Sequence, residues 1–435
     1  MVEAWLPSWV DNSRIGTGAA PDQPFDEFLN VPNELQEALY AALADDLAAG
    51  RLRRATNTAE ASYKRVLGCV AANAIVAMEK GPRTFVHYSR GKGTYAGKSV
   101  YYPEWMSSKL LRASIDKLAE AGWLSVETAD AGPFGGQGRP RSTYEATPQL
   151  QTRLRELGIT VEGVERDHKA APVVLVRGES GKLQNYDPRA DAIAPKIEFL
   201  MRWNEWISQQ DLGLKLPDDM KAPNPVPDLN ARRLMRWFSN SFEEHGRFYG
   251  GWWQNLKKEQ RPHITISEEP TVELDFQGLA PRLLYHLEGM EFDGDPYEIP
   301  EIRSAGEAEG IAWEDLRPVV KKVFNYMLNA RKRGGYNRSD AFKGWPSEIS
   351  AQWAIEAIER FHAPIKHRFF KREALRLMNF DSQICEEVMR AGLEQNIPVL
   401  PIHDSFIVAE RHEVWLIEQM RRAYLLVVGY VPVIR

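Results

Sequence analysis

Two aspartates that lie far apart in the 435-residue sequence each stand where a short apolar segment ends. Asp275 follows segment 272–274, which predicts a short strand, and Asp404 lies between the apolar halves of segment 397–410, which predicts a tight β-hairpin. A carboxylate beside buried strands is costly unless something pairs with it. Two carboxylates that converge from two strands can hold a pair of divalent ions, which clamp an in-line phosphoryl displacement. The alternative for Asp404 is an Asx-type turn, in which the carboxylate bonds only its own backbone.

A third chemical feature is a predicted helix from about Asp315 to Arg331, whose polar side chains recur every four residues and so share one face. That face carries Arg317, Lys321, Asn325 and Asn329, beside an apolar face of Val320, Phe324 and Leu328. A guanidinium fork at Arg317 and a compact charge at Lys321 suit a triphosphate, and Lys321 could also give a proton to the leaving group. Lys322 competes with Lys321 for this role. A merely solvated helix face is the alternative.

These stretches, in this order, resemble the motifs of family A DNA polymerases and of the single-subunit, phage-type RNA polymerases. Asp275 with the following turn, helix and Arg282 resembles motif A, and Arg317-x-x-x-Lys321 resembles motif B. His403-Asp404-Ser405-Phe406 resembles motif C and is closer in wording to the RNA polymerases. Two further segments fit the order: 245–249 is similar to an Arg-Gly-Arg-x-Tyr element, and the segment from Met378-Asn379 to Met389 stands where the family has its last palm helix. The resemblance covers roughly residues 232–410.

The resemblance implies a site for nucleotidyl transfer that uses two Mg²⁺ ions, for which Mn²⁺ could substitute. Asp275 and Asp404 would bridge both ions, with the backbone carbonyl of Phe276 as a further ligand. The implied catalytic residues are Asp275, Asp404 and Lys321. The implied nucleotide contacts are Arg317, Lys321, Asn325, Asn329, Ala280 and Phe276. The implied nucleic-acid contacts in this half are Arg247, Tyr249, Arg282, His403 and Asn379, although His403 is expected to pack and hydrogen-bond rather than to bind metal.

The sequence departs from the family pattern at the position that contacts the sugar. DNA polymerases of the family carry a Glu five residues after the motif A Asp, where this chain has Ala280. Asn325 and Asn329 replace the Phe of the DNA polymerases and the usual Tyr. A small residue leaves room for a ribose 2′-hydroxyl and an Asn can bond it, so we expect ribonucleotides to be accepted.

The first half of the sequence resembles a winged-helix domain. A predicted amphipathic helix from Ser107 to Ala121 is followed by a strand at 123–127, a basic loop and a partner strand at 143–146. Lys109 and Arg112 on the helix would face a DNA groove, and Arg139 and Arg141 in the loop would contact phosphates or the minor groove. The alternative is that the wing is a solvated loop and the helix makes protein contacts.

Length and composition set the class of the protein. With 43% hydrophobic and 26% charged residues, the chain can build ordinary cores. The net charge of −5 gives no global signal for nucleic acid, so any such surface is local. Cys69 and Cys385 suggest neither a disulfide framework nor a zinc site. No signal peptide and no membrane span is predicted, so a cytoplasmic protein without a membrane partner is the default.

The predicted fold class is α+β: an N-terminal winged-helix domain, then a compact right-hand polymerase palm with an antiparallel sheet and small fingers. The predicted segments are an arm and helix (1–60), the winged-helix domain (61–165), a connector or reduced thumb (166–230), and the palm and fingers (231–435). Arg232, Arg233 and Arg236 are expected on one side of a helix, and 425–434 is expected to be a final strand. No exonuclease pattern precedes the palm, so no proofreading domain is expected.

Three functions remain open at this stage. The first is a compact, template-dependent nucleotidyltransferase, such as a primase, a small RNA polymerase or a specialised DNA polymerase, with a DNA template and nucleoside triphosphates as partners and replication or repair proteins as further ones. The second is a non-catalytic, DNA-binding replication initiator with a polymerase-like scaffold. A metal-dependent nuclease is the third, but it leaves Arg317 and Lys321 unexplained.

Overall fold

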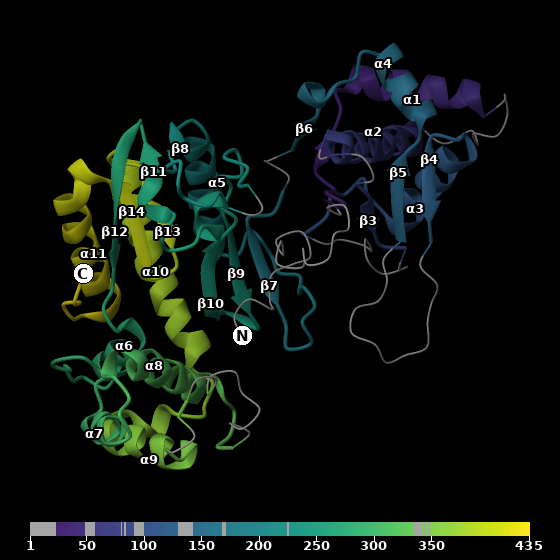
Figure 1. The fold of residues 1–435 in the computed structure, drawn as a ribbon. Coiled ribbons are helices and arrows are strands. Elements are labelled where there is room, and N and C mark those ends of the chain that lie inside the picture. Colours follow the sequence, from purple (N-terminus) through teal and green to yellow (C-terminus); the bar gives the residue numbers. More distant parts are fainter. Residues whose placement is uncertain are drawn as a thin grey trace. The chain divides into compact units, whose positions relative to one another are not determined.

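The computed structural model describes residues 23–47, 57–79, 81, 84–90, 100–128, 142–167, 171–223, 226–334, 342, 345–346 and 349–435. The chain forms two compact units, Val2–Pro172 and Val173–Arg435, each with its own hydrophobic core. The boundary falls inside segment 166–230, which the sequence suggested as a connector. Both units mix helices with mainly antiparallel sheets, so the fold is α+β (Figure 1).

The smaller unit places its helices against a four-stranded sheet of order β1-β3-β5-β4. Its helices are α1 (Asn33–Asp46), α2 (Asn57–Glu79), α3 (Ser108–Glu120) and α4 (Pro148–Glu156). Its sheet strands are β1 (Gln23–Pro24), β3 (Val86–Tyr88), β4 (Leu124–Glu127) and β5 (Ser142–Ala146), and β2 (Leu29–Asn30) pairs with β6 (Glu165–Arg166). Ser107 caps α3 by accepting from the Leu110 amide. The predicted helix and its following strand pair are confirmed.

The larger unit contains two sheets. One has the order β10-β9-β7 and the other β13-β14-β12-β11-β8. The strands are β7 (Val174–Arg177), β8 (Leu212–Leu214), β9 (Met235–Ser239), β10 (Ser241–Tyr249), β11 (Ile264–Ile266), β12 (Glu269–Asp275), β13 (Leu400–Ile402) and β14 (Ser405–Ala409). Residues 397–410 thus contain the predicted hairpin, with His403 and Asp404 as its turn.

The helices of the larger unit are α5 (Ala194–Ser208), α6 (Leu279–Leu287), α7 (Pro300–Ala308), α8 (Trp313–Asn329), α9 (Ala351–Phe361), α10 (Glu373–Glu394) and α11 (Glu413–Val428). Helix α10 packs against β10 and also contacts α5, α6, α8 and α11. Figure 1 shows α6, α7, α8 and α9 gathered beyond the end of the sheet at which β12 stops. Gly278, whose φ is +61°, lets the chain turn from that strand end into α6.

Two expectations about secondary structure are wrong. Arg236 lies in strand β9, not on a helix with Arg232 and Arg233, because its segment pairs with both β7 and β10. Residues 425–428 form the last turn of α11, because this helix packs against α10 and continues through them. Beyond the helix, Ile434 forms an isolated β-bridge to Phe276. In both cases tertiary contacts outweigh local preference.

Candidate active site

Asp275 and Asp404 come together at one end of the larger sheet. Strands β12 and β14 pair in an antiparallel register that sets Asp275 opposite Ser405. The amide of Phe276 donates to the backbone oxygen of Asp404 over 3.3 Å. Asp275 is therefore the last residue of β12, and Asp404 lies beside it in the turn that leads into β14. Sequence predicted both the strand ends and their convergence.

The carboxylate of Asp275 is incompletely bonded. Burial raises the pKa of Asp275 to about 6, and the neighbouring Asp404 adds to the increase. Its Oδ1 atom is buried and has no hydrogen-bond partner in the described part of the chain. Its Oδ2 lies 3.3 Å from the guanidinium of Arg435, a partner that the sequence did not predict. An under-bonded carboxylate beside another acid is a setting in which a cation would be stabilising.

The donor chemistry at this point fits Mg²⁺ or Mn²⁺. No cluster of three or more His, Cys, Asp or Glu side chains with metal-binding geometry occurs among the described residues. Mg²⁺ does not require such a cluster, since it keeps several waters and is bound through one or two carboxylates plus substrate phosphates. The ring of Phe276 is 3% exposed and packs near Phe406 and Tyr424, so only its backbone could serve as the further ligand that was predicted.

Helix α8 carries the predicted cationic face. Val320, Phe324 and Leu328 are buried in the core, as their spacing indicated, while Lys321 is exposed and Arg317 half-buried. The ring of Tyr297 links this face to the acids: its centroid lies 5.6 Å from the Arg317 guanidinium and 5.8 Å from Lys321 Nζ. Burial raises the pKa of Tyr297, and the charge of Asp404 adds to this increase. Burial is the main cause of the raised pKa of Asp275, and the charge of Lys321 opposes that increase.

Arg317 already has an anionic partner in this structure. Its Nε donates to Asp295 Oδ2 over 2.5 Å, so the acidic loop before α7 is not simply solvated. Burial raises the pKa of Asp295, but the hydrogen bonds from Arg317 and from the Tyr297 amide, together with the nearby arginine charges, outweigh burial and the pKa lies below the ordinary value. A triphosphate that used Arg317 would have to replace this carboxylate. Lys322, the competing candidate, is exposed on the neighbouring position of α8.

The residues expected at the sugar lie on α6 and α8. Ala280 is half-buried in the first turn of α6, five residues after Asp275. Asn329 is exposed and donates to the backbone oxygen of Asn325, one turn earlier in α8. Asn325 is half-buried, and no hydrogen bond of its side chain occurs among the described residues. The small side chain and the amide groups are present, and their role stays a prediction.

Arg247, Tyr249 and His403 form one polar cluster beside Asp404. The rings of Tyr249 and His403 are 5.2 Å apart, and Tyr249 bonds His245 over 2.9 Å. His403 has a φ of +54°, a conformation that is uncommon for residues other than Gly, although His is among those that adopt it more often. Burial lowers the pKa of His403 to about 4, with Arg247 adding to the effect, so the ring is neutral near pH 7. Its buried Nδ1 has no partner in the described part of the chain.

Two other predicted nucleic-acid contacts are buried and bonded to the backbone. Arg282 donates to the carbonyl oxygens of Gln277, Phe292 and Gly294 at 3.0, 2.5 and 2.6 Å. Asn379 donates to the carbonyl oxygens of Phe242 and His245 over 3.1 and 3.4 Å. Both side chains are less than 10% exposed. These hydrogen bonds fix the backbone of the segments that lie near the candidate site.

Sequence reasoning missed Asp381 on α10. Its Oδ2 accepts from Arg247 Nε over 2.6 Å, and its side chain is 3% exposed. Burial raises the pKa of Asp381 to about 6; Arg247 opposes this increase, while Asp404 and Asp275 add to it. Asp381 is thus electrostatically coupled to both predicted metal ligands. A lone acid in an amphipathic helix pattern gives no sequence signal of this kind.

The predicted DNA-contacting residues of the smaller unit are only partly described. Lys109 is exposed on α3, and Arg112 is half-buried and donates to the backbone oxygen of Ser108. Arg139 and Arg141, the predicted wing residues, lie outside the described residues. None of the helices in the described ranges is both long and apolar enough to cross a membrane.

Comparison with known proteins gives one weak similarity. No family model matches the sequence, and no curated protein matches it. Among solved structures, the chain is similar to the "POL domain of Pol1 from M. smegmatis complex with DNA primer-template and dNTP". The TM-score is 0.31 and the identity 14%, over 94% of this chain and 66% of that one, so the chain spans about two thirds of that domain's length. This is a weak structural similarity to a DNA polymerase domain.

Proposed function

We propose that the protein is a template-dependent nucleotidyltransferase, a small polymerase or primase, with its active site at Asp275 and Asp404. The observation that carries the proposal is the meeting of Asp275 and Asp404 at one sheet end, where the buried Oδ1 of Asp275 has no hydrogen-bond partner among the described residues. The ring of Tyr297 lies beside Arg317 and Lys321 on the cationic face of α8. A nuclease would need the acids but not the cationic face of α8. The order of the predicted motifs along the sequence supports the same function.

In this proposal each group has one task. Asp275 and Asp404 hold divalent cations, which when bound supply charge neutralisation and activate the attacking 3′-hydroxyl. Arg317 and Lys321 orient the triphosphate, and Lys321 donates a proton to the departing pyrophosphate. Arg247, Tyr249 and His403 face the end of the growing strand. The neutral His403 ring can donate or accept a hydrogen bond there without competing for the cation.

The substrate proposed is a ribonucleotide or a mixture of both sugars. Ala280 offers no carboxylate to exclude a 2′-hydroxyl, and the Asn side chains at 325 and 329 can bond one. We further propose that the smaller unit is a winged-helix domain that binds nucleic acid through Lys109, Arg112, Arg139 and Arg141. Its α3 and the β4–β5 pair have the order of elements that such a domain requires.

The test is incorporation of labelled nucleotides on single-stranded and on primed DNA, with Mg²⁺ or Mn²⁺ and with either NTPs or dNTPs. Extension that is lost in D404N supports polymerisation, and the preferred sugar and the need for a primer then separate primase, RNA polymerase and DNA polymerase. Incorporation of dNTPs alone would contradict the ribonucleotide proposal. DNA binding without incorporation under any condition would instead indicate the non-catalytic initiator.

A further inference from the structure

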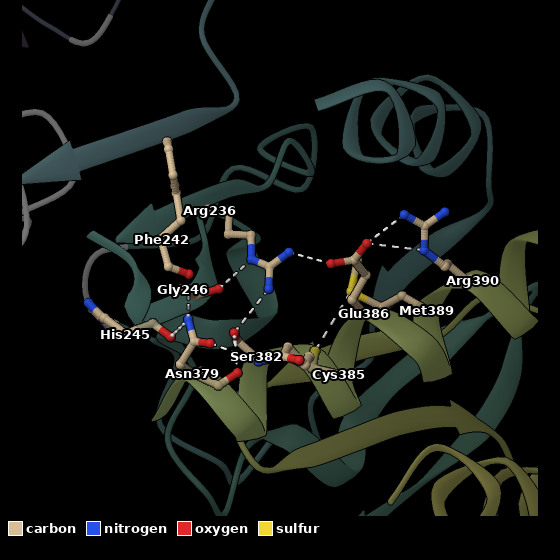
Figure 2. A network of polar contacts seen from close by, with 11 residues as sticks. Arg236, Phe242, His245, Gly246, Asn379, Ser382, Cys385, Glu386, Met389 and Arg390 are labelled. Atoms are coloured by element: carbon tan, nitrogen blue, oxygen red, sulfur yellow. Dashed lines mark hydrogen bonds and ion pairs between the residues drawn. The ribbon is translucent and has the colours of Figure 1, made fainter. Parts of the chain in front are cut away.

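Helix α10 is joined to the β9–β10 hairpin by two buried ion pairs. Arg236 of β9 pairs with Glu386, and Arg247 of β10 pairs with Asp381. The first pair belongs to a network in which Arg236 also donates to the Gly246 carbonyl and to Ser382 (Figure 2). The second pair is the one beside Asp404, and it is less completely bonded.

Arg247 lies near two acids. It pairs with Asp381, and it shares a face of β10 with Tyr249, whose ring centroid lies 5.2 Å from that of His403, the residue before Asp404. Burial lowers the pKa of Arg247, but Asp381 and Asp404 outweigh burial and raise it above the ordinary value. The hydrogen bond, however, goes only to Asp381, through Nε. The terminal Nη1 and Nη2 atoms of Arg247 donate to no other group in the described part of the chain.

A free guanidinium would be a strong competitor at Asp404. Its fork matches a carboxylate and forms two charge-assisted hydrogen bonds. In a partly buried site the attraction between such groups is several-fold larger than in water. A carboxylate neutralised in this way would be a poor ligand for a divalent cation. The arrangement therefore needs a second acid that holds the Arg247 side chain in another direction.

We propose that Asp381 is a positioning residue that holds the Arg247 guanidinium away from Asp404 and so keeps the Asp404 carboxylate available for a divalent cation. This inference rests on the proposed function, because it concerns the same site. It also accounts for an acid that is 2% exposed and keeps Oδ1 without a partner among the described residues. A purely structural acid at this place would be expected to be fully bonded, as Glu386 is.

The test is a double-mutant cycle read by Mn²⁺ binding, measured by electron paramagnetic resonance at pH 8 without nucleotide or nucleic acid. The variants are D381N, R247M and D381N/R247M, with E410Q as a control for the loss of an exposed carboxylate just after β14. D381N is expected to weaken Mn²⁺ binding about tenfold, because the released Arg247 pairs with Asp404. R247M alone is expected to change binding less than about threefold, whereas in the D381N background it restores binding to near the wild-type level.

Two results would overturn the proposal. One is unchanged Mn²⁺ binding in D381N. The other is additive effects of the two substitutions, which would mean that Asp381 acts only through its own charge. The proposed function fails separately, and takes this inference with it, if wild type and D404N bind Mn²⁺ equally. Thermal unfolding of each variant confirms that the proteins compared are folded.

Discussion

The two ion pairs between α10 and the β9–β10 hairpin differ in how fully they are bonded. Arg236 has three partners, and Glu386 also accepts from Arg390 (Figure 2). Burial raises the pKa of Glu386, but Arg236 and Arg390 outweigh burial and the pKa lies below the ordinary value. Asp381 has one cationic partner, and its pKa is raised to about 6.

This difference suggests a structural role for the Arg236–Glu386 pair and a place in the candidate active site for the Arg247–Asp381 pair. The first pair satisfies its members and fixes a close approach of chain segments: a Cβ on Gly246 would lie 2.7 Å from Ser382 Oγ. The second leaves a carboxylate oxygen and two guanidinium nitrogens without hydrogen bonds in the described part of the chain, next to Asp404. An incompletely bonded buried group lowers stability unless a ligand completes it, which is typical of functional sites.

The largest expected effect comes from breaking the structural pair. R236M removes the buried cation that bonds Glu386 and the Gly246 carbonyl and leaves Glu386 with Arg390 alone, so it should lower the free energy of unfolding by about 3–5 kcal/mol. R247M should lower the free energy of unfolding by less than half as much, because Asp381, whose pKa is already raised, can bind a proton and become neutral when its cation is removed. Urea unfolding at pH 7 measures both. Equal losses for the two variants would remove the distinction between the pairs.

The next prediction uses pH to compare the two acids. An Asp titrates near 3.9 in the unfolded chain. Because the folded-state pKa of Asp381 is about 6, its contribution to stability is fully present below about pH 4 and is lost as the pH rises through 6. D381N avoids this loss and should be about 1–2 kcal/mol more stable than wild type at pH 8, with no such advantage at pH 4.

E386Q should show the opposite pH dependence. Because the pKa of Glu386 is lower in the folded protein than in the unfolded chain, its ionised carboxylate stabilises the fold at pH values above the unfolded-state pKa. E386Q should therefore lower the free energy of unfolding by about 1–3 kcal/mol at pH 8, and by less as the pH falls below about 4. Urea midpoints of both variants and wild type, measured in EDTA from pH 4 to 8, give the comparison. The same pH profile for D381N and E386Q would contradict it.

The smallest expected effect concerns a third, more exposed pair, Arg317–Asp295, whose side chains are 30% and 18% exposed. If a triphosphate replaces Asp295 on Arg317, D295N removes the competing carboxylate. The nucleotide concentration for half-maximal incorporation should then fall about threefold, with little change in the maximal rate. Steady-state kinetics measures both quantities, with E298Q as a control in the same loop. A higher half-saturating concentration would mean that Asp295 orients Arg317 instead of competing for it.

Much of the candidate site could be predicted because its parts are local. Strand ends at Asp275 and Asp404 follow from apolar runs, and the face of α8 follows from a four-residue period. Helix α3 and strands β4 and β5 of the smaller unit likewise follow from short-range patterns. Each of these needs only neighbouring residues to be recognised.

What escaped prediction depends on contacts between distant segments. Asp381 belongs to the candidate site because it pairs with Arg247, which lies more than a hundred residues earlier in the chain. Tyr297 belongs to it because the loop before α7 places its ring next to Arg317 of α8. Arg236 was expected on a helix because its arginine neighbours suggested a face, yet pairing with β7 and β10 makes it a buried strand residue. Arg435 reaches Asp275 only because the end of the chain pairs with residues 275–277. No local pattern encodes these pairings.

Asp275 and Asp404 perform the chemical step in the proposed function. The most direct measurement is the rate of incorporation of one nucleotide in a single turnover, in the primer, sugar and metal conditions that wild type prefers, for wild type, D275N, D404N and the control E410Q. If the proposed function is right, D275N and D404N each lose at least about a thousandfold in rate while remaining folded. The control E410Q stays within about threefold of wild type. A rate for D275N or D404N within about tenfold of E410Q would contradict the proposed function.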